Sequence, residues 1–184
     1  MIPNVVIETA RLHLRPFTSA DLDHLHRLWT DPDVRRYLFD GEIIPRGRVA
    51  EEIAGSLERF KTKGCGLWSA FPKGERDLIG FCGYRFFHQP PELQLLYGFA
   101  PTHWGHGLAT EAARAMIRYG FEKLALTSVI ASADAVNTSS LRVMEKAGMT
   151  FEKRAMIGGL DTVYYTLLRE AFQPDKAHYL VRND

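Results

Sequence analysis

The sequence predicts a single α/β or α+β domain in which strands alternate with helices around a mixed sheet. The chain has 184 residues, which is enough for one domain with a full core. Hydrophobic residues make up 46% and charged residues 24%, as in ordinary soluble globular proteins. The spacing of apolar residues switches repeatedly between a strand period and a helix period. We therefore expect one domain over residues 1–184.

The first elements are a strand and a capped helix. Leu12 and Leu14 alternate with polar residues in RLHLR, which predicts a half-buried strand. In TSAD, Thr18 is a candidate N-cap and Asp21 follows three residues later, as in a capping box. The helix after it has one apolar face, formed by Leu22, Leu25, Leu28 and Trp29. TDPD ends this helix, and a short helical segment is expected over residues 33–38.

The middle of the chain predicts one helix and three strands. Apolar residues at helical spacing indicate an amphipathic helix over residues 48–63, closed by GCG. The spacing then changes to that of strands over residues 67–71, 78–87 and 93–100, separated by PKGERD and HQPPE.

The second half alternates helix and strand. A helix is expected over residues 108–123 and a strand over residues 128–133. The next helix has Asn137 or Thr138 as its cap and Gly148 as its C-terminal stop. A late strand is expected over residues 162–168.

Composition excludes several classes of partner. The 23 basic and 22 acidic residues are mixed along the chain and leave a net charge of +1, which argues against nucleic acid or a membrane surface. No apolar run reaches 18 residues and no signal peptide is recognised, so a cytoplasmic location is expected. Cys65 and Cys82 form no CxxC site and are interpreted as reduced core thiols.

The segment PTHWGHGLATEAARAMIRYGF, residues 101–121, has two glycines directly before a strong helix former. At each of these positions glycine is less favourable for helix formation than alanine by ~1 kcal/mol. Gly105 and Gly107 would let an anion approach the free N–H groups at the helix start, with His106 as an additional proton donor. No lysine follows Gly107 as in a Walker loop, and Thr110 replaces the third glycine of a dinucleotide fingerprint.

A second polar helix start, NTSSLRVMEKAG, lies about thirty residues further on. Asn137 and Ser140 are three residues apart and are expected to face one cleft, although capping explains either residue by itself.

Three separated segments resemble the GNAT superfamily of acetyl-CoA-dependent N-acetyltransferases, and within it the RimJ/RimL-like branch. ETARLHLRPFTSADLDHLHRLWTDPDVRRYL is similar to the opening of that branch, and residues 104–112 match its W-G-x-G-x-A-T-E-A motif. Residues 137–149 match N-x-x-S-x-x-V-x-E-K-x-G-[FM]. The resemblance implies a mixed, mostly antiparallel sheet of six to seven strands flanked by helices, in the order β-α-α-β-β-β-α-β-α-β-β.

The resemblance also implies a binding site for coenzyme A. Backbone amides of residues 105–110 would hold the pyrophosphate, and the strand near Leu96 would carry a bulge, separate from its neighbour and bind the pantetheine arm. Asn137 would contact that arm, and Ser140 would lie near the sulfur as a general acid. The implied cofactor-binding residues are Tyr97, Gly98, Phe99, Trp104, Gly105, His106, Gly107, Leu108, Ala109, Thr110, Asn137 and Ser140.

The expected reaction is direct attack of a neutral amine on the thioester. Many relatives have a glutamate where this chain has Gln94, which cannot accept a proton. Glu92, two residues earlier on the same strand face, is the predicted base, and Asp134 is the other candidate. Tyr164 or Tyr165 is an alternative proton donor to Ser140.

Other residues receive weaker interpretations. His103 and His106 form an H-x-x-H pair without further ligands nearby, so no metal is expected. The candidate lining of an acceptor pocket comprises Tyr37, Phe39, Trp68 and Tyr84, of which Trp68 and Tyr84 fit core packing better.

We therefore predict transfer of acetyl from acetyl-CoA to a primary amine, foremost a protein N-terminus. A small amine or an aminoglycoside remains open as acceptor. Two other functions also remain open: a catalytically silent module that binds acyl-CoA, and a nucleotide-binding protein that shares only the glycine loop. A homodimer is also left open.

Overall fold

The computed structural model describes residues 5–183, over which nine strands form one sheet in the order β7-β8-β6-β5-β4-β3-β2-β1-β9. All neighbours are antiparallel except β5 and β6. The strands are β1 (Val5–Glu8), β2 (Leu12–Pro16), β3 (Leu67–Pro72), β4 (Gly80–Phe87), β5 (Glu92–Phe99), β6 (Ser128–Asp134), β7 (Thr150–Ile157), β8 (Leu160–Leu168) and β9 (Leu180–Asn183). The mixed, mostly antiparallel sheet flanked by helices is confirmed.

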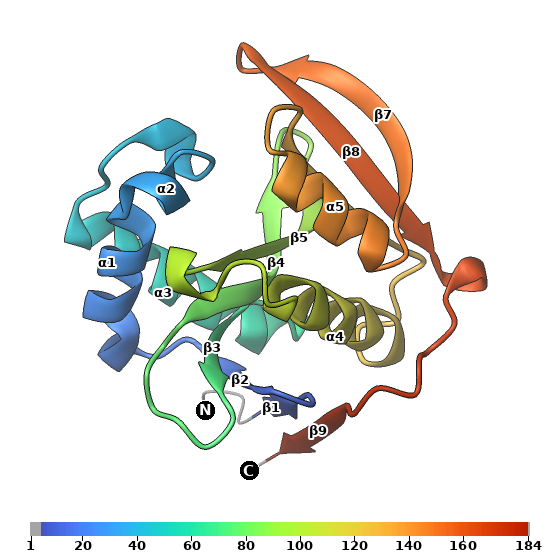
Figure 1. Ribbon diagram of the computed structural model, residues 1–184, viewed down its shortest axis with the longest axis horizontal. Helices are drawn as coiled ribbons and strands as arrows, with labels where there is room; N and C mark the ends of the chain where they lie inside the picture. Colours follow the sequence, from blue (N-terminus) through green and yellow to red (C-terminus); the bar gives the residue numbers. More distant parts are fainter. Residues whose placement is uncertain (1–4, 184) are drawn as a thin grey trace.

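The helices cover both faces of the sheet (Figure 1). They are α1 (Leu22–Thr30), α2 (Pro32–Arg35), α3 (Arg46–Lys63), α4 (Leu108–Glu122) and α5 (Thr138–Lys146). Phe81 and Leu96 pack with α1 and α3, whereas their neighbours Cys82 and Leu95 pack in the cluster that contains α4. This alternation follows from the strand period of two.

The expected number of six to seven strands was too low, because two short strands were missed at one edge of the sheet. β1 has only four residues, and no glycine or proline marks its turn into β2. β9 pairs with β1 from the far end of the chain, so only tertiary contact defines it. Of the predicted single domain over residues 1–184, residues 1–4 and 184 lie outside the described part of the chain.

Local signals in the sequence correspond to local structure. Asp21 accepts a hydrogen bond from the Thr18 N–H (2.8 Å) and forms a bidentate pair with Arg15 (2.7 Å to each oxygen). Gly64 ends α3 in the left-handed conformation, with φ of +69°. Within residues 5–183, no helix is long and apolar enough to cross a membrane.

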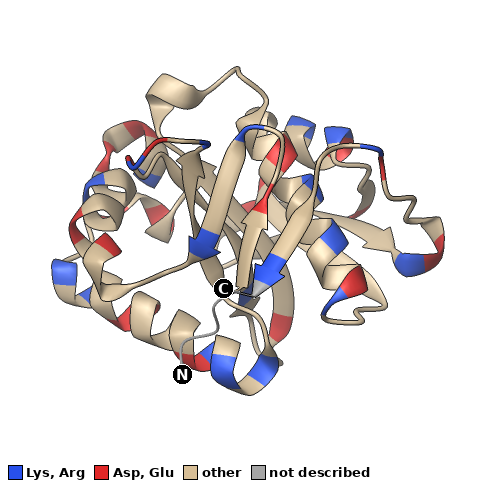
Figure 2. Cartoon of the chain, turned by 90° about the horizontal axis from the view of Figure 1, so that it is seen from below, with Lys and Arg blue, Asp and Glu red and all other residues tan. Residues whose placement is uncertain are grey.

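Surface charges are mixed in the view of Figure 2, where Lys and Arg alternate with Asp and Glu across the visible elements. This agrees with the near-neutral net charge of +1. Cys65 and Cys82 are both buried and free, and burial raises the pKa of both thiols.

One carboxylate joins distant parts of the fold. Glu111, in the first turn of α4, accepts hydrogen bonds from Thr9 Oγ1 (2.6 Å), the Arg11 N–H (2.8 Å) and Arg11 Nε (2.7 Å). Arg11 Nη1 also donates to the His106 carbonyl oxygen (2.8 Å). The turn between β1 and β2 is thereby attached to the start of α4. Burial works to raise the pKa of Glu111, but these hydrogen bonds outweigh it and leave the pKa below 4.5.

Replacing Glu111 by glutamine should lower the free energy of unfolding at neutral pH by ~1–3 kcal/mol, because Gln accepts weaker hydrogen bonds and does not neutralise Arg11. The pKa of Glu111 is lower in the folded than in the unfolded chain, so its stabilisation is complete above about pH 4.5 and disappears as pH falls through the folded-state value. Thermal unfolding of wild type and Glu111→Gln over a pH series measures this. A difference in melting temperature that stays constant down to acid pH would contradict the assignment.

Candidate active site

A gap in the sheet between β5 and β6 opens the site. β4 and β5 pair continuously from Gly80↔Phe99 to Phe87↔Glu92, but β5 and β6 share only the pair Gln94↔Ile130. Beyond that pair the two strands separate, as expected. The expected bulge near Leu96 does not appear as a register shift against β4.

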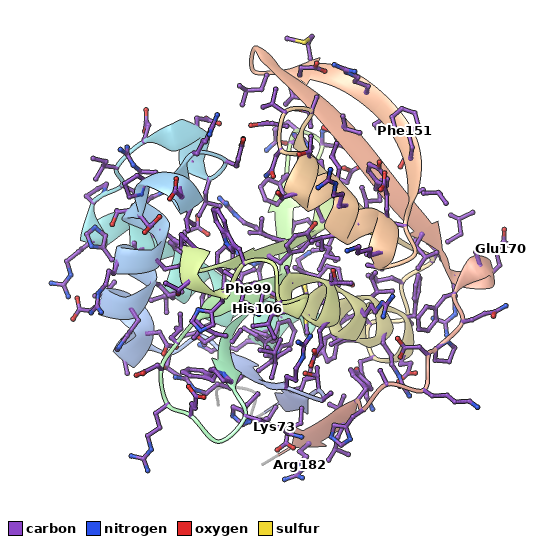
Figure 3. All side chains as sticks on the ribbon, in the orientation of Figure 1. Lys73, Phe99, His106, Phe151, Glu170 and Arg182 are labelled. Carbon is purple, nitrogen blue, oxygen red and sulfur yellow. The ribbon has the colours of Figure 1, made fainter. Side chains whose placement is uncertain are left out.

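A cavity of about 360 Å³ lies at this separation, walled by α2, the end of β5, the start of α4 and one face of α5. Its lining brings together most of the predicted cofactor-binding residues: Tyr97, Gly98, Phe99, Trp104, Gly105, Gly107, Leu108, Ala109, Thr110, Asn137 and Ser140. Figure 3 shows Phe99 and His106 at the centre of the molecule, where β5 leads into α4. Residues as distant in the sequence as Asp33 and Lys146 therefore line one cavity.

The glycine loop has the geometry of an anion-binding helix start. Gly105 and Gly107 both have left-handed backbones, with φ of +79° and +77°, which other residues adopt at a cost. The first intrahelical bond of α4 runs from the Glu111 N–H to the Gly107 carbonyl (3.0 Å), and no side chain caps this end. The N–H groups of residues 108–110 thus remain available to an anion.

Trp104 and His106 make contacts that differ from the expected contacts with a cofactor. Trp104 donates its indole N–H to the Phe99 carbonyl (2.7 Å), which fastens the loop to the end of β5. The His106 side chain is exposed and is not part of the cavity wall; its carbonyl oxygen is the group that Arg11 holds.

Asn137, Ser140 and Tyr97 form a hydrogen-bonded group on the opposite wall. Asn137 Oδ1 caps α5 by accepting from the Ser140 N–H (3.2 Å), which leaves the Asn137 amide N–H groups for a ligand. Tyr97 Oη lies 3.0 Å from both the Ser140 carbonyl oxygen and Ser140 Oγ. Burial raises the pKa of the Tyr97 phenol, so it remains protonated and can donate.

The candidate bases lie beside the cavity rather than on its wall. Gln94 is buried, donates from Nε2 to Glu92 (2.6 Å) and accepts from Ser132 Oγ (2.7 Å), so its amide connects β5 to β6 and orients Glu92. Burial, followed by the nearby carboxylate of Asp40, raises the pKa of Asp134. Neither Glu92 nor Asp134 lines the cavity.

The aromatic candidates separate into wall and core. Tyr37 lines the cavity, whereas Trp68 and Tyr84 are fully buried in the core. Tyr165 donates to Glu145 (2.8 Å) and Tyr164 lies 3.0 Å from His88 Nε2, and neither tyrosine reaches the cavity. His103 lines the cavity, but among the described residues no group of side chains is placed to hold a metal.

Sequence reasoning missed three charged residues on the cavity wall: Asp33 from α2, and Arg142 and Lys146 from α5. The spacing could have identified the last two, because Ser139, Arg142 and Lys146 follow one another at intervals of three and four residues along one helix face. Nothing in the local sequence of Asp33 indicates its position, because α2 reaches the site only through tertiary packing.

Comparison with known proteins identifies the family. The model of the acetyltransferase (GNAT) domain matches residues 11–150. An uncharacterized N-acetyltransferase of Bacillus subtilis, YnaD, is 32% identical over 173 residues, covering 89% of this chain and 97% of that protein. Spermidine N(1)-acetyltransferase of Escherichia coli is 27% identical over 148 residues, covering 78% and 75% of the two chains.

A solved structure shows the same fold. RimL, a ribosomal L7/L12 alpha-N-protein acetyltransferase in complex with coenzyme A, superposes with a TM-score of 0.75 at 14% identity, covering 93% of this chain and 99% of that one. At this sequence identity the likeness shows the fold alone. Proteins of the acetyltransferase (GNAT) family use acetyl-CoA. The chain belongs to the GNAT acetyltransferase family, and it is an N-acetyltransferase.

Proposed function

We propose that the enzyme transfers the acetyl group of acetyl-CoA to a protein N-terminal α-amine. The observation that carries the choice of acetyl-CoA as the donor is one continuous wall: the open N–H groups of residues 108–110, the unpaired edge of β5 and the Ser140 hydroxyl line a single cavity. An anion site, a row of backbone groups and a hydroxyl match the pyrophosphate, the pantetheine amides and the thioester in order.

Each part of the donor then has a partner. The amides of residues 105–110 hold the pyrophosphate, and the negative charge of Glu111 does not oppose it because Arg11 is paired with that carboxylate. The edge of β5 at Tyr97, Gly98 and Phe99 hydrogen-bonds the pantetheine arm, and the free Asn137 N–H groups donate to one of its carbonyls.

The reaction is attack of the neutral amine nitrogen on the thioester carbon, followed by cleavage of the C–S bond. A backbone N–H of β5 stabilises the tetrahedral oxyanion. An α-amine has a pKa of ~7.7–8.0, so a useful fraction of it is neutral at pH 7. A lysine side chain has a pKa of ~10.4 and is almost fully charged at that pH. An α-amine therefore needs only a weak base.

Ser140 donates to the departing sulfur. The Tyr97 phenol has one proton and lies 3.0 Å from both the Ser140 carbonyl oxygen and Ser140 Oγ. When it donates to Oγ, the Ser140 proton is free to reach the thioester sulfur. The amine proton leaves through water to Glu92, which Gln94 orients, or to Asp134, whose raised pKa favours proton acceptance.

A small cationic amine is the second candidate acceptor. Asp33 lies on the cavity wall, and Asp40 and Asp134 are close enough for the charge of one to affect the pKa of the other. Carboxylates near the acceptor side favour a substrate with several ammonium groups, such as that of the spermidine acetyltransferase relative.

The proposed acceptor class is tested by turnover with acetyl-CoA and a matched panel: peptides with free N-termini, the same peptides with blocked N-termini, spermidine and an aminoglycoside. We expect CoA release with free N-termini and none with blocked ones. Turnover with spermidine and with none of the peptides would contradict the proposed acceptor and favour a small cationic amine. Binding of CoA without turnover on any amine would indicate a silent acyl-CoA-binding module.

Gly107→Ala should weaken CoA binding on the order of tenfold, because the displaced amides lose charge-assisted hydrogen bonds to the pyrophosphate. Gly74→Ala is the control: Gly74 also has a left-handed backbone (φ +82°), but it belongs to the β3–β4 turn. A Cβ at Gly74 would lie in open space, and a Cβ at Gly107 would make only an ordinary contact with Arg11 Nη2 (3.6 Å). Both variants should lose ~1–2 kcal/mol of stability. Equal CoA affinities in the two variants would disprove the loop assignment.

Ser140→Ala should lower kcat ~10²-fold, as expected for loss of a group that assists the leaving thiolate, and leave CoA affinity nearly unchanged. Tyr97→Phe should lower kcat by about tenfold in the wild-type background and not at all in Ser140→Ala, because it acts through Ser140. Kinetics of the two single variants and the double variant measure this coupling. Additive effects would show that Tyr97 acts independently.

A further inference from the structure

The side chains of Glu52, Arg59 and Arg85 form a charged cluster where α3 packs against β4, on the face of the sheet opposite α4 and α5. Arg85 Nη2 donates to Glu52 Oε1 (2.9 Å), and this carboxylate is buried. Arg59 lies two helical turns after Glu52 on α3. Burial lowers the pKa of Arg59, and among the neighbouring charges that of Glu52 raises it and that of Arg85 lowers it. Two guanidinium groups therefore share one buried carboxylate.

The guanidinium of Arg59 is buried without enough hydrogen-bond acceptors. Its Nε and Nη2 are shielded from water and have no hydrogen-bond partner among the residues that the structure describes. Gly55, one turn earlier, lets the group lie back along α3, because a Cβ there would be 3.3 Å from Arg59 Nη1. Buried donors without partners are costly, and more so in a charged group. The arrangement therefore favours a state in which an acceptor reaches Arg59.

Glu52 is the carboxylate that could satisfy Arg59, but Arg85 engages it. Arg48 competes only weakly, because its Nη2 is 3.8 Å from Glu52 and its Nη1 pairs with Glu51 (3.3 Å). An anion that accepted the hydrogen bond of Arg85 would leave Glu52 free to turn toward Arg59. Binding of an anion at Arg85 would thus also supply the missing acceptor of Arg59.

Arg85 lies beside the opening in the sheet. It is paired directly with Gln94 of β5, so the two side chains are on the same face. Gln94 stands where the pairing of β5 with β6 ends, and it holds Glu92. The Arg85 side chain is 23% exposed and lies over the Phe87 ring, 5.0 Å from its centroid. An anion bound at Arg85 would therefore lie one strand away from the gap.

The active-site cavity opens toward the same face. Phe81 packs in the cluster with α1 and α3, whereas Tyr97 contacts Ser140 of α5 on the other face, and all three residues line the cavity. The cavity thus reaches both faces of the sheet through the gap between β5 and β6. With the donor against α4 and α5, an acceptor amine can approach the thioester from the face that carries Arg85.

The charges on this face differ on the two sides of the gap. Asp134 follows Ser132 by two residues on β6, and Ser132 donates to Gln94, so Asp134 is on the face that carries Arg85. The carboxylate of Asp40 is close enough to Asp134 to affect its pKa. Carboxylates therefore lie on the β6 side and the Arg85 guanidinium on the β4 side. An acceptor that has both an ammonium group and a carboxylate matches this distribution.

We infer that Arg85 binds a carboxylate of the acceptor, so that the enzyme prefers N-termini with an acidic residue close to the α-amine. The inference rests on the proposed function, in which the acceptor is a protein N-terminus. The guanidinium forms a charge-assisted hydrogen bond with the acceptor carboxylate, and Glu52 then turns toward Arg59. Arg85 determines specificity in this arrangement and takes no part in proton transfer.

The test compares peptide acceptors that differ only in one carboxylate. Initial rates with acetyl-CoA are measured for peptides with aspartate as the second or third residue and for the same peptides with asparagine. At one of these positions the kcat/KM of wild type should be about tenfold higher for aspartate, mainly through KM, as expected for one charge-assisted contact.

Variants of the cluster should change this ratio in opposite directions. Arg85→Gln should reduce it to less than about twofold, and Arg85→Lys should restore part of it. Glu52→Gln should raise the ratio, because it removes the carboxylate that competes for Arg85. Arg46→Gln is the matched control, since Arg46 is at the start of α3 and pairs with Asp23 of α1. It should keep the ratio of wild type.

A wild-type ratio near one at both positions would overturn the inference and leave the proposed function intact. A ratio that Arg85→Gln does not change would also overturn it, because another residue would then recognise the carboxylate. Equal loss of activity on both peptides of a pair would show a merely structural role for Arg85. Absence of turnover with every peptide would overturn the proposed acceptor and the inference together.

Thermal unfolding shows whether each variant is folded. Arg85→Gln leaves the buried Glu52 without its hydrogen bond from β4. If that variant does not fold, the double variant Glu52→Gln/Arg85→Gln, which removes both charges, gives the answer: it should show no preference for aspartate. A tenfold preference that persists in the double variant would overturn the inference.

Discussion

The rest of the structure depends on the carboxylate of Glu111. It accepts three hydrogen bonds from the β1–β2 turn, while the Arg11 guanidinium that it orients also holds the His106 carbonyl. A loop that contains two left-handed glycines has little intrinsic preference for one conformation. Fixing its carbonyl from outside reduces the entropy that a ligand would otherwise have to overcome on binding. The same contact neutralises the one acidic charge in the first turn of α4, where a phosphate has to bind.

The opening in the sheet has a comparable physical basis. A parallel pair that ends after Gln94↔Ile130 leaves backbone groups of β5 without sheet partners, which is unfavourable unless water or a ligand satisfies them. Gln94 stabilises the point of separation, because its amide connects Glu92 on β5 to Ser132 on β6. Gln94, which cannot act as a base, thus has a structural role at the point where the two strands separate.

Much of this arrangement follows from local sequence. The spacing of Leu12 and Leu14, the Asn137 cap and the glycines before α4 all depend on neighbours within a few residues, so they can be predicted. The attachment of Arg11 to Glu111 spans 100 residues, and β9 exists only because β1 is beside it. The position of Asp33 depends on such distant packing too, which is why its place on the cavity wall could not be predicted.

Tertiary contacts also connect the C-terminal edge strand to the start of α4. β9 pairs with β1, and β1 leads into the turn that Glu111 holds. The segment before β9 lines a cavity of about 370 Å³ together with Arg11 and Glu111, so β9 and the Glu111 contact belong to the same part of the fold. Loosening β9 should therefore disturb the glycine loop before α4, although β9 lies at the edge of the sheet and contributes no residue to the candidate active site.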